Sequence, residues 1–238
     1  MNKSTRVVIF DLDDTLIDTS NVFFEVRESF VAFMVSRGFV ETSVRSLLDR
    51  VEAENLLNFG YISERNLISV RETYEGLAEG SGVTFSSADL RKIASIASKC
   101  LYAMPKPMPY ARRLVTWSAT KFRLALITRG SAALQNAKVD TLGIRPQLEM
   151  IQVVDRKTAD TFGVVADALN CQPQDCISIG DSMPFDIVTA IEAGMTAIHV
   201  IYPRPEIQWE HDKATGATSR AQYQVASLRE VRGILESW

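Results

Sequence analysis

The chain has 238 residues, a formal net charge of −3 and three cysteines, Cys100, Cys171 and Cys176. Basic and acidic residues are interspersed, which argues against binding of polymeric nucleic acid, and the cysteines lack the spacing of a disulfide framework or a zinc site. No apolar run is long enough for a signal-peptide core or a membrane span, so we expect a cytoplasmic protein without a membrane partner. The sequence leaves the oligomeric state open.

The first predicted element is a short buried strand that ends in a group of carboxylates. Val7–Phe10 is an apolar run typical of a parallel strand buried on both faces, and Asp11-Leu12-Asp13-Asp14-Thr15 follows it directly. Two carboxylates about 4 Å apart repel each other by roughly 4 kcal/mol at an effective dielectric of about 20, so a cation or a bound proton is needed. The carboxyl end of such a strand is where open α/β sheets bind ligands. The alternative interpretation is an acidic turn in which Asp14 and Thr15 cap the next helix.

Residues 19–104 show helical periodicity. Apolar residues three or four positions apart predict four amphipathic helices, around positions 22–34, 44–51, 67–77 and 90–97. A proline-rich stretch follows at 104–109. We therefore expect a small helical domain over 19–104, inserted into a domain formed by 1–18 and 105–238.

From Pro109 onward, short apolar runs alternate with helical patterns. The predicted strands are 122–127, 148–154, 176–179 and 196–201, and the predicted helices between them are 110–119, 132–142, 159–169 and 184–193. This alternation predicts a parallel sheet with helices on both faces, and the strand before Asp11 is expected to join it. Residues 203–222 are expected to be irregular, with a last helix near 227–236.

Polar residues suited to chemistry follow three of these later strands. They are Thr128 and Arg129 after the first, Lys157 after the second, and Asp181 and Asp186 after the third. Each has an ordinary interpretation as a helix cap or a solvated charge. Because the carboxyl ends of parallel strands meet at one edge of a sheet, we expect the side chains at positions 128, 157, 181 and 186 to converge with those at 11 and 13 around one divalent ion.

This combination resembles the haloacid dehalogenase-like (HAD) hydrolase superfamily. The family's signature motifs match Asp11-x-Asp13-x-Thr15, Thr128, Lys157 and Gly180-Asp181-x-x-x-x-Asp186, and the helical insertion stands at the family's first cap site. The resemblance implies a Rossmann-like α/β core with helices on both faces and a smaller four-helix cap, as in the phosphoglycolate phosphatase branch. Arg129 and Thr158 depart from the residues common in relatives, and neither replaces a reacting group.

The resemblance also implies a mechanism. Asp11 would be the nucleophile that forms an aspartyl-phosphate, and Asp13 would act first as an acid and then as a base. The side chains of Asp11 and Asp181 and the backbone carbonyl of Asp13 would bind Mg²⁺, while Asp186 would orient its ligands or waters. Thr128, Lys157 and nearby backbone N–H groups would stabilise the charge of the transferred phosphate. Arg129, which departs from the family pattern, is a further candidate for phosphate binding, with a surface arginine as the alternative. The expected protein is a Mg²⁺-dependent phosphatase of a small phosphorylated metabolite.

Other functions share parts of this pattern. Asp13 argues against a dehalogenase, because a halide leaving group needs no acid, and a phosphonatase would need a lysine earlier in the cap than Lys92. A phosphomutase uses the same core and remains an alternative. From a different class, a receiver-type signalling domain also gathers acids, a hydroxyl and a lysine, but it is shorter and lacks a helical insertion. A binding protein without turnover is disfavoured because every reacting group is present.

Overall fold

The computed structural model describes residues 5–60, 64–81, 86–204 and 221–238. The chain forms two compact units, one made of Met1–Ser20 with Pro105–Trp238 and the other of Asn21–Met104. We call the first the core unit and the second the cap unit.

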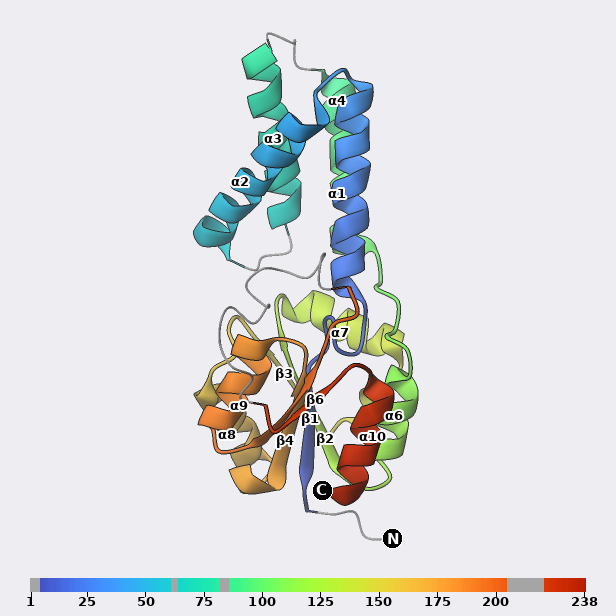
Figure 1. Ribbon diagram of the computed structural model, residues 1–238, viewed down its shortest axis with the longest axis vertical. Helices are drawn as coiled ribbons and strands as arrows, with labels where there is room; N and C mark the ends of the chain where they lie inside the picture. Colours follow the sequence, from blue (N-terminus) through green and yellow to red (C-terminus); the bar gives the residue numbers. More distant parts are fainter. Residues whose placement is uncertain (1–4, 61–63, 82–85, 205–220) are drawn as a thin grey trace. The chain divides into compact units, whose positions relative to one another are not determined.

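The core unit is built on a six-stranded sheet in which every neighbouring pair of strands is parallel. The strand order is β3-β2-β1-β4-β5-β6, so the expected parallel sheet that includes the strand before Asp11 is confirmed (Figure 1). The strands are β1 Val7–Phe10, β2 Arg123–Arg129, β3 Met150–Val154, β4 Cys176–Gly180, β5 Thr196–Val200 and β6 Tyr223–Val225.

Helices cover both faces of this sheet, as the sequence predicted (Figure 1). Those of the core unit are α6 Ala111–Ser118, α7 Ala132–Leu142, α8 Ala159–Ala168, a π-helical segment Met183–Val188, α9 Thr189–Glu192 and α10 Leu228–Ser237. Short 3-10 turns lie at Arg145–Gln147 and Pro173–Asp175. The first turn of α1, Thr19–Ser36, begins in the last two residues of the core unit's N-terminal segment.

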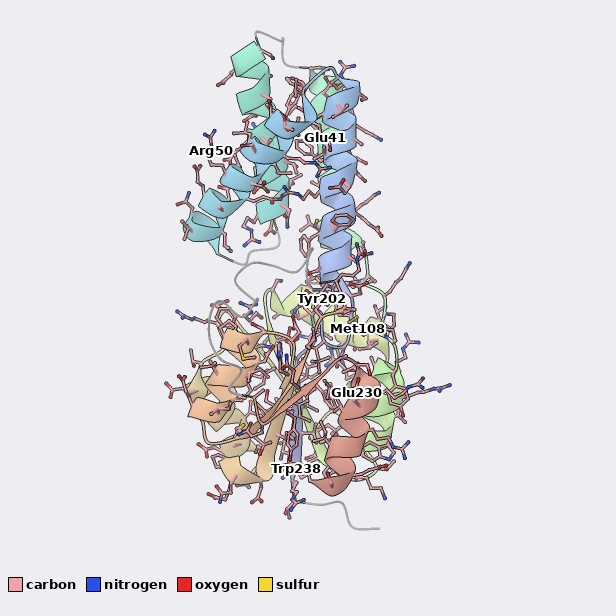
Figure 2. The ribbon with its side chains drawn as sticks, viewed as in Figure 1. Glu41, Arg50, Met108, Tyr202, Glu230 and Trp238 are labelled. Atoms are coloured by element: carbon pink, nitrogen blue, oxygen red, sulfur yellow. The ribbon has the colours of Figure 1, made fainter. Side chains whose placement is uncertain are left out.

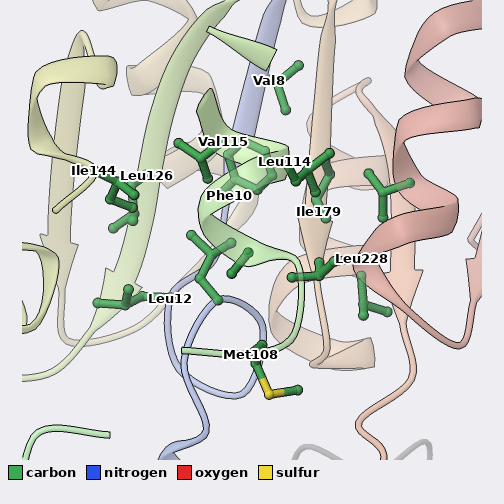
Figure 3. Close-up of a cluster of buried hydrophobic side chains, with 14 of the residues drawn as sticks. Val8, Phe10, Leu12, Met108, Leu114, Val115, Leu126, Ile144, Ile179 and Leu228 are labelled. Carbon is green, nitrogen blue, oxygen red and sulfur yellow. The ribbon is translucent and has the colours of Figure 1, made fainter. Parts of the chain in front are cut away.

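Strand β1 is buried on both faces because its side chains alternate between two apolar clusters. Val8 and Phe10 pack with Leu114 of α6 and Leu228 of α10 in one cluster, several of whose side chains are drawn in Figure 3. Val7 and Ile9 belong to the other cluster, with residues of α8 and α9. Burying a large apolar side chain stabilises the fold by roughly 1.5–3 kcal/mol. The strand that carries Asp11 is therefore fixed from both sides.

The strand order reverses direction beside β1, and this fixes where a ligand can bind. The chain runs from β1 outward to β2 and β3, and then returns to the other side of β1 to form β4, β5 and β6. In open parallel sheets the crevice at such a reversal, outside the carboxyl ends of the strands, is the usual ligand site. Tyr202 follows the carboxyl end of β5, and in the core unit it lies with Met108 at the end opposite Trp238 (Figure 2).

The cap unit is helical throughout its described residues, which confirms the helical insertion after β1. Its helices are α1 Thr19–Ser36, α2 Glu41–Phe59, α3 Arg65–Ser81, α4 Ser87–Ala97 and the short α5 Lys99–Tyr102. One apolar cluster joins them, including Phe30 of α1, Leu48 of α2, Tyr74 of α3 and Ile93 of α4. The fifth helix was not predicted, because four residues are too few to show a helical period.

Three elements of the core unit differ from the sequence expectation. The predicted helix at 184–193 is divided into a π-helical segment and α9, since the Ile187 N–H reaches the Ser182 carbonyl five residues back (3.3 Å). Strand β3 starts at Met150 because Leu148 ends a 3-10 turn. Strand β6 follows the segment expected to be irregular, of which 205–220 lies outside the described residues.

Candidate active site

The carboxyl ends of β1, β2 and β4 bring the predicted site residues to one edge of the sheet. Phe10 pairs with Leu126 of β2 and Ile179 of β4, and the Asp11 N–H continues the ladder by donating to the Ile179 carbonyl (2.9 Å). Asp11 and Asp181 therefore follow the ends of two neighbouring strands, β1 and β4, at nearly the same level of the sheet. The strand order reverses between these two strands.

Asp11, Lys157 and Asp186 form a buried ionic cluster. The Lys157 Nζ atom lies 2.5 Å from Asp11 Oδ1 and 2.5 Å from Asp186 Oδ1. The three side chains are 7 %, 3 % and 2 % exposed, respectively. An ammonium group so deeply buried needs charged partners to offset its lost hydration, and the two carboxylates supply them.

This cluster shifts the protonation equilibria of its members. Burial raises the pKa of Asp11 to about 7, against the attraction of Lys157 and with the repulsion of Asp186 and Asp13. Burial alone would lower the pKa of the Lys157 ammonium, but the two carboxylates outweigh it and raise that pKa above the usual range. Asp11, Asp181 and Asp186 bring three carboxyl groups together beside one buried ammonium, and a bound cation would favour their charged forms.

Asp11, Asp181 and Asp186 could hold that cation. One carboxylate oxygen from each lies within 4.8 Å of the others. The Asp11 Oδ2 atom is buried and has no hydrogen-bond partner among the described residues. A buried carboxylate oxygen without a donor is costly unless a further positive group faces it. An all-oxygen acidic donor set is typical of Mg²⁺, so the residues fit that ion.

Both carboxylate oxygens of Asp186 accept from the protein. Its Oδ1 atom contacts Lys157, and its Oδ2 atom accepts the Ser182 N–H (3.0 Å). This leaves Asp186 suited to orienting its neighbours. Gly180 makes the arrangement possible, because a Cβ atom there would collide with the Asp186 side chain.

Asp13 is held by three donors from two helices. Its Oδ1 atom accepts from Lys138 Nζ of α7 (2.6 Å) and from the Thr19 hydroxyl of α1, and its Oδ2 atom accepts from Gln135 Nε2 of α7 (2.6 Å). Burial raises the pKa of Asp13, but Lys138 and the hydrogen bonds from Thr19 and Gln135 outweigh it and hold that pKa below its usual value. Asp13 is therefore a carboxylate in this arrangement.

Thr128 and Arg129 end strand β2 beside these acids. Thr128 is fully buried, and its hydroxyl accepts from Gln135 Nε2 (2.5 Å), which also donates to the Arg129 carbonyl (2.8 Å). The Arg129 guanidinium stacks over the ring of Phe185, with its central carbon 4.1 Å from the ring centroid. The alternative interpretation of an acidic turn that caps the next helix holds for Asp14 alone, which is buried and accepts from the Ser20 N–H (2.8 Å), whereas the Thr15 hydroxyl bonds to Asp181.

Sequence reasoning missed the contacts that α7 makes with Asp13. Gln135 and Lys138 share the buried face of α7 with Val139 and Leu142. The sequence did contain an indication of these contacts. Two polar residues lie on the face of the helix where an amphipathic helix normally has apolar residues. The Nε2 atom of His199 in β5 pairs with the Asp181 carbonyl (2.9 Å).

The fold and the site together define an α/β core with a helical insertion after its first strand and a buried cluster of acids after β1 and β4. A family model described as haloacid dehalogenase-like hydrolase matches residues 5–194, and the chain belongs to this family. Membership of a hydrolase family decides against the receiver-type signalling domain. The described helices include none that is both long and apolar enough to cross a membrane.

Curated relatives cover nearly the whole chain at low identity. The chain is 23 % identical to N-acylneuraminate-9-phosphatase from Mus musculus over 246 residues, covering 98 % of this chain and 94 % of the relative. It is 25 % identical to glyceraldehyde 3-phosphate phosphatase from Pyrococcus furiosus over 241 residues, covering 97 % and 93 %. Both relatives are named as phosphatases of small phosphorylated metabolites.

Solved structures show the same fold. A haloacid dehalogenase-like family hydrolase from Xanthomonas campestris superposes with a TM-score of 0.77 at 18 % identity, covering 99 % of this chain and 96 % of the other. The HAD hydrolase YfnB from Bacillus subtilis, in a structure bound to magnesium, superposes with a TM-score of 0.67 at 18 % identity, covering 98 % and 99 %.

Proposed function

We propose that this protein is a Mg²⁺-dependent phosphatase that hydrolyses a small-molecule phosphomonoester through an aspartyl-phosphate on Asp11. The observation that carries the proposal is the state of the Asp11 carboxylate. One of its oxygens is paired with Lys157, and the other is buried without a donor inside a cluster of three acids. A nucleophile placed in this way can approach an anionic ester once the surrounding charge is balanced.

In the first step, an Asp11 carboxylate oxygen attacks phosphorus and the bond to the ester oxygen breaks. Asp13, in its protonated form, gives its proton to the departing alcohol oxygen. The Lys157 ammonium and the Thr128 hydroxyl are placed to stabilise the negative charge on the phosphoryl oxygens. Arg129, held against Phe185 at the end of β2, is proposed to add a third contact to the phosphate.

In the second step, Asp13 takes a proton from a water molecule, and the water oxygen attacks phosphorus. The bond between phosphorus and Asp11 breaks, which releases inorganic phosphate and restores the Asp11 carboxylate. The donors around Asp13 favour its carboxylate, the form that this step requires. The proton that Asp13 takes from water replaces the one it gave to the alcohol, so the protons balance over the cycle.

The side chains of Asp11 and Asp181 and the Asp13 carbonyl are proposed to hold Mg²⁺, with Asp186 orienting the neighbouring groups. When bound, Mg²⁺ offsets the charge that the carboxylates and the phosphate bring together. Two observations support this ion: the all-oxygen acidic cluster, and the likeness of the fold to a hydrolase whose structure contains magnesium.

The proposed substrate is a small phosphorylated metabolite, with no nucleic-acid or membrane partner. The names of the relatives support this class, because one is an N-acylneuraminate-9-phosphatase and another a glyceraldehyde 3-phosphate phosphatase. We propose that residues 19–104 form the cap domain that selects the substrate and that 1–18 with 105–238 form the catalytic domain. A phosphomutase would use the same Asp11 but transfer the phosphoryl group to a sugar hydroxyl.

Phosphate release from a panel of sugar phosphates, nucleotides and phosphoglycolate, with and without Mg²⁺, tests the proposal. The expected result is Mg²⁺-dependent release of inorganic phosphate, abolished by EDTA and by Asp11→Asn, together with a phosphorylated Asp11 peptide after rapid quenching. Absence of a phosphorylated Asp11 at any time during turnover would contradict the mechanism. A phosphorylated isomer appearing in place of inorganic phosphate would identify a mutase.

A further inference from the structure

Helix α7 holds the carboxylate of Asp13 at two points. We infer that Lys138, assisted by Gln135, is a positioning residue that fixes the orientation of the Asp13 carboxylate for proton transfer. This inference rests on the proposed function, because it takes Asp13 as the group that moves protons. Neither the family match nor the expected motif residues assign a role to these two side chains.

The geometry restrains the carboxylate against rotation. Lys138 Nζ contacts Asp13 Oδ1 and Gln135 Nε2 contacts Asp13 Oδ2, each at 2.6 Å. The terminal torsion of an aspartate is broad when it is unrestrained, so a single contact would leave the carboxylate free to turn. Helix α7 supplies one donor to each oxygen, both from the same face, and the Thr19 hydroxyl of α1 adds a second, uncharged donor to Oδ1. Lys138 is the charged member of the three, so it is expected to fix the carboxylate more strongly than the Thr19 hydroxyl does.

Burial makes a purely structural role for Lys138 a poor explanation. Lys138 is 8 % exposed and lies on the face of α7 that also buries Val139 and Leu142. An apolar side chain of similar length would pack there without losing the hydration of an ammonium group, and buried ion pairs are often no more stabilising than such replacements. The side chain of Asp13 is 28 % exposed, so the carboxylate is supported from α7 and remains accessible.

Gln135 also ties Asp13 to the place where the phosphate is proposed to bind. Its Nε2 group lies within 2.5 Å of the Thr128 hydroxyl and 2.8 Å of the Arg129 carbonyl, in addition to Asp13. One amide group therefore sets the distance between the proton-transfer carboxylate and the end of β2. Errors in placing a catalytic group by about 1 Å cost on the order of 100-fold in rate, which is the reason to expect such a restraint.

The two half-reactions can be measured separately. A structural role of Lys138 would change the rates of both, whereas a role in positioning Asp13 would change only the rates of steps that transfer a proton. A p-nitrophenolate leaving group departs without a proton, so formation of the phospho-enzyme from p-nitrophenyl phosphate does not need Asp13. An alkyl phosphate needs Asp13 in both steps. If Lys138 positions Asp13, Lys138→Met will slow turnover of an alkyl phosphate while leaving the initial burst of p-nitrophenolate unchanged.

The experiment compares Lys138→Met, Gln135→Met and Asp13→Asn with the wild type, using the full chain with Mg²⁺. The control is Lys121→Met, which makes the same change at an exposed lysine outside the site. We expect Lys138→Met to lower kcat on glycerol phosphate about 10- to 100-fold, with a change in the burst rate on p-nitrophenyl phosphate below about threefold. Gln135→Met also loses the contact with Thr128, so it is expected to lower the burst rate as well, with a larger loss in alkyl phosphate turnover. Lys138→Arg is expected to recover part of the rate.

Three outcomes would overturn the inference. Full activity of Lys138→Met on glycerol phosphate would show that the contact is dispensable. An equal loss in the burst rate and in alkyl phosphate turnover would assign Lys138 to phosphate binding or to folding. If Lys138→Met does not fold, a Gln135→Met variant with unchanged alkyl phosphate turnover would be decisive. Normal rates in Asp13→Asn would instead refute the proposed function itself.

Discussion

Thr15 and Asp181 exchange two hydrogen bonds across 166 residues of sequence. The Asp181 N–H donates to the Thr15 hydroxyl (3.0 Å), and that hydroxyl donates to Asp181 Oδ1 (3.2 Å). Both groups are buried, so the orientation of the Asp181 carboxylate depends on a side chain from the loop after β1.

Replacing Thr15 with valine keeps the shape of the side chain and removes both hydrogen bonds. Because Asp181 then loses its orientation, we expect Mg²⁺ to bind about 10- to 100-fold more weakly, the range seen when supporting groups of metal ligands are lost. The Mg²⁺ concentration needed for half-maximal activity measures this effect. Thr15→Ser retains the hydroxyl and should behave like the wild type; equal loss in both variants would contradict the role of the hydroxyl.

A methyl group at Gly180 should displace Asp186. In Gly180→Ala the added Cβ atom meets the Asp186 side chain, which is fixed by Lys157 and Ser182 and cannot move without breaking those contacts. We expect kcat to fall at least about 10-fold and the melting temperature to decrease. Gly163→Ala, in α8, is the matched control because no atom lies within 4 Å of its added Cβ. That variant should be as active as the wild type and slightly more stable, since alanine favours helix.

Mg²⁺ should stabilise the folded protein if the acidic cluster binds it. At about 100 times its dissociation constant, a ligand specific for the folded state adds roughly 2.7 kcal/mol to the free energy of unfolding. Thermal unfolding with EDTA and with increasing MgCl₂ measures the shift. Asp181→Asn should lose it, whereas Asp167→Asn, at an exposed aspartate in α8, should keep it. A shift of the same size in both variants would place the ion elsewhere.

Lys157 should be needed for activity more than any other lysine. In Lys157→Met the carboxylates of Asp11 and Asp186 lose their shared cation while both stay buried. We expect kcat to fall by at least about 10³-fold, because a group that stabilises transferred charge is lost. Breaking a buried ion pair costs up to roughly 3–5 kcal/mol, so chemical denaturation should show a less stable protein. Retention of more than a tenth of wild-type kcat would argue against the proposed role.

Arg129 provides a test of the phosphate contacts. If its guanidinium binds the phosphate, Arg129→Gln should raise KM several-fold with a smaller change in kcat, because the contact is present in both the bound ester and the transition state. Phe185→Leu removes the aromatic ring under the guanidinium and should raise KM by less. Unchanged KM in Arg129→Gln would make this arginine a surface charge.

The sheet and the acids at its edge could be predicted because they follow a simple rule. Apolar runs such as Val7–Phe10 define the strands, and residues after parallel strands must meet at one edge. The contact between Lys138 and Asp13 could not be predicted in this way. The spacing of residues along a helix shows which of them share a face, but it does not show which loop that face will contact. Strand β6 was missed because Tyr223–Val225 is short and its first two residues are exposed.

The central position of β1 has a consequence for how the protein is synthesised. Its partners are β2, which begins at Arg123, and β4, which begins at Cys176. On the ribosome this apolar strand therefore emerges long before either partner, whereas the helices that follow it can form through local contacts. We expect the nascent chain to expose β1 during much of translation, which makes early recruitment of a chaperone advantageous.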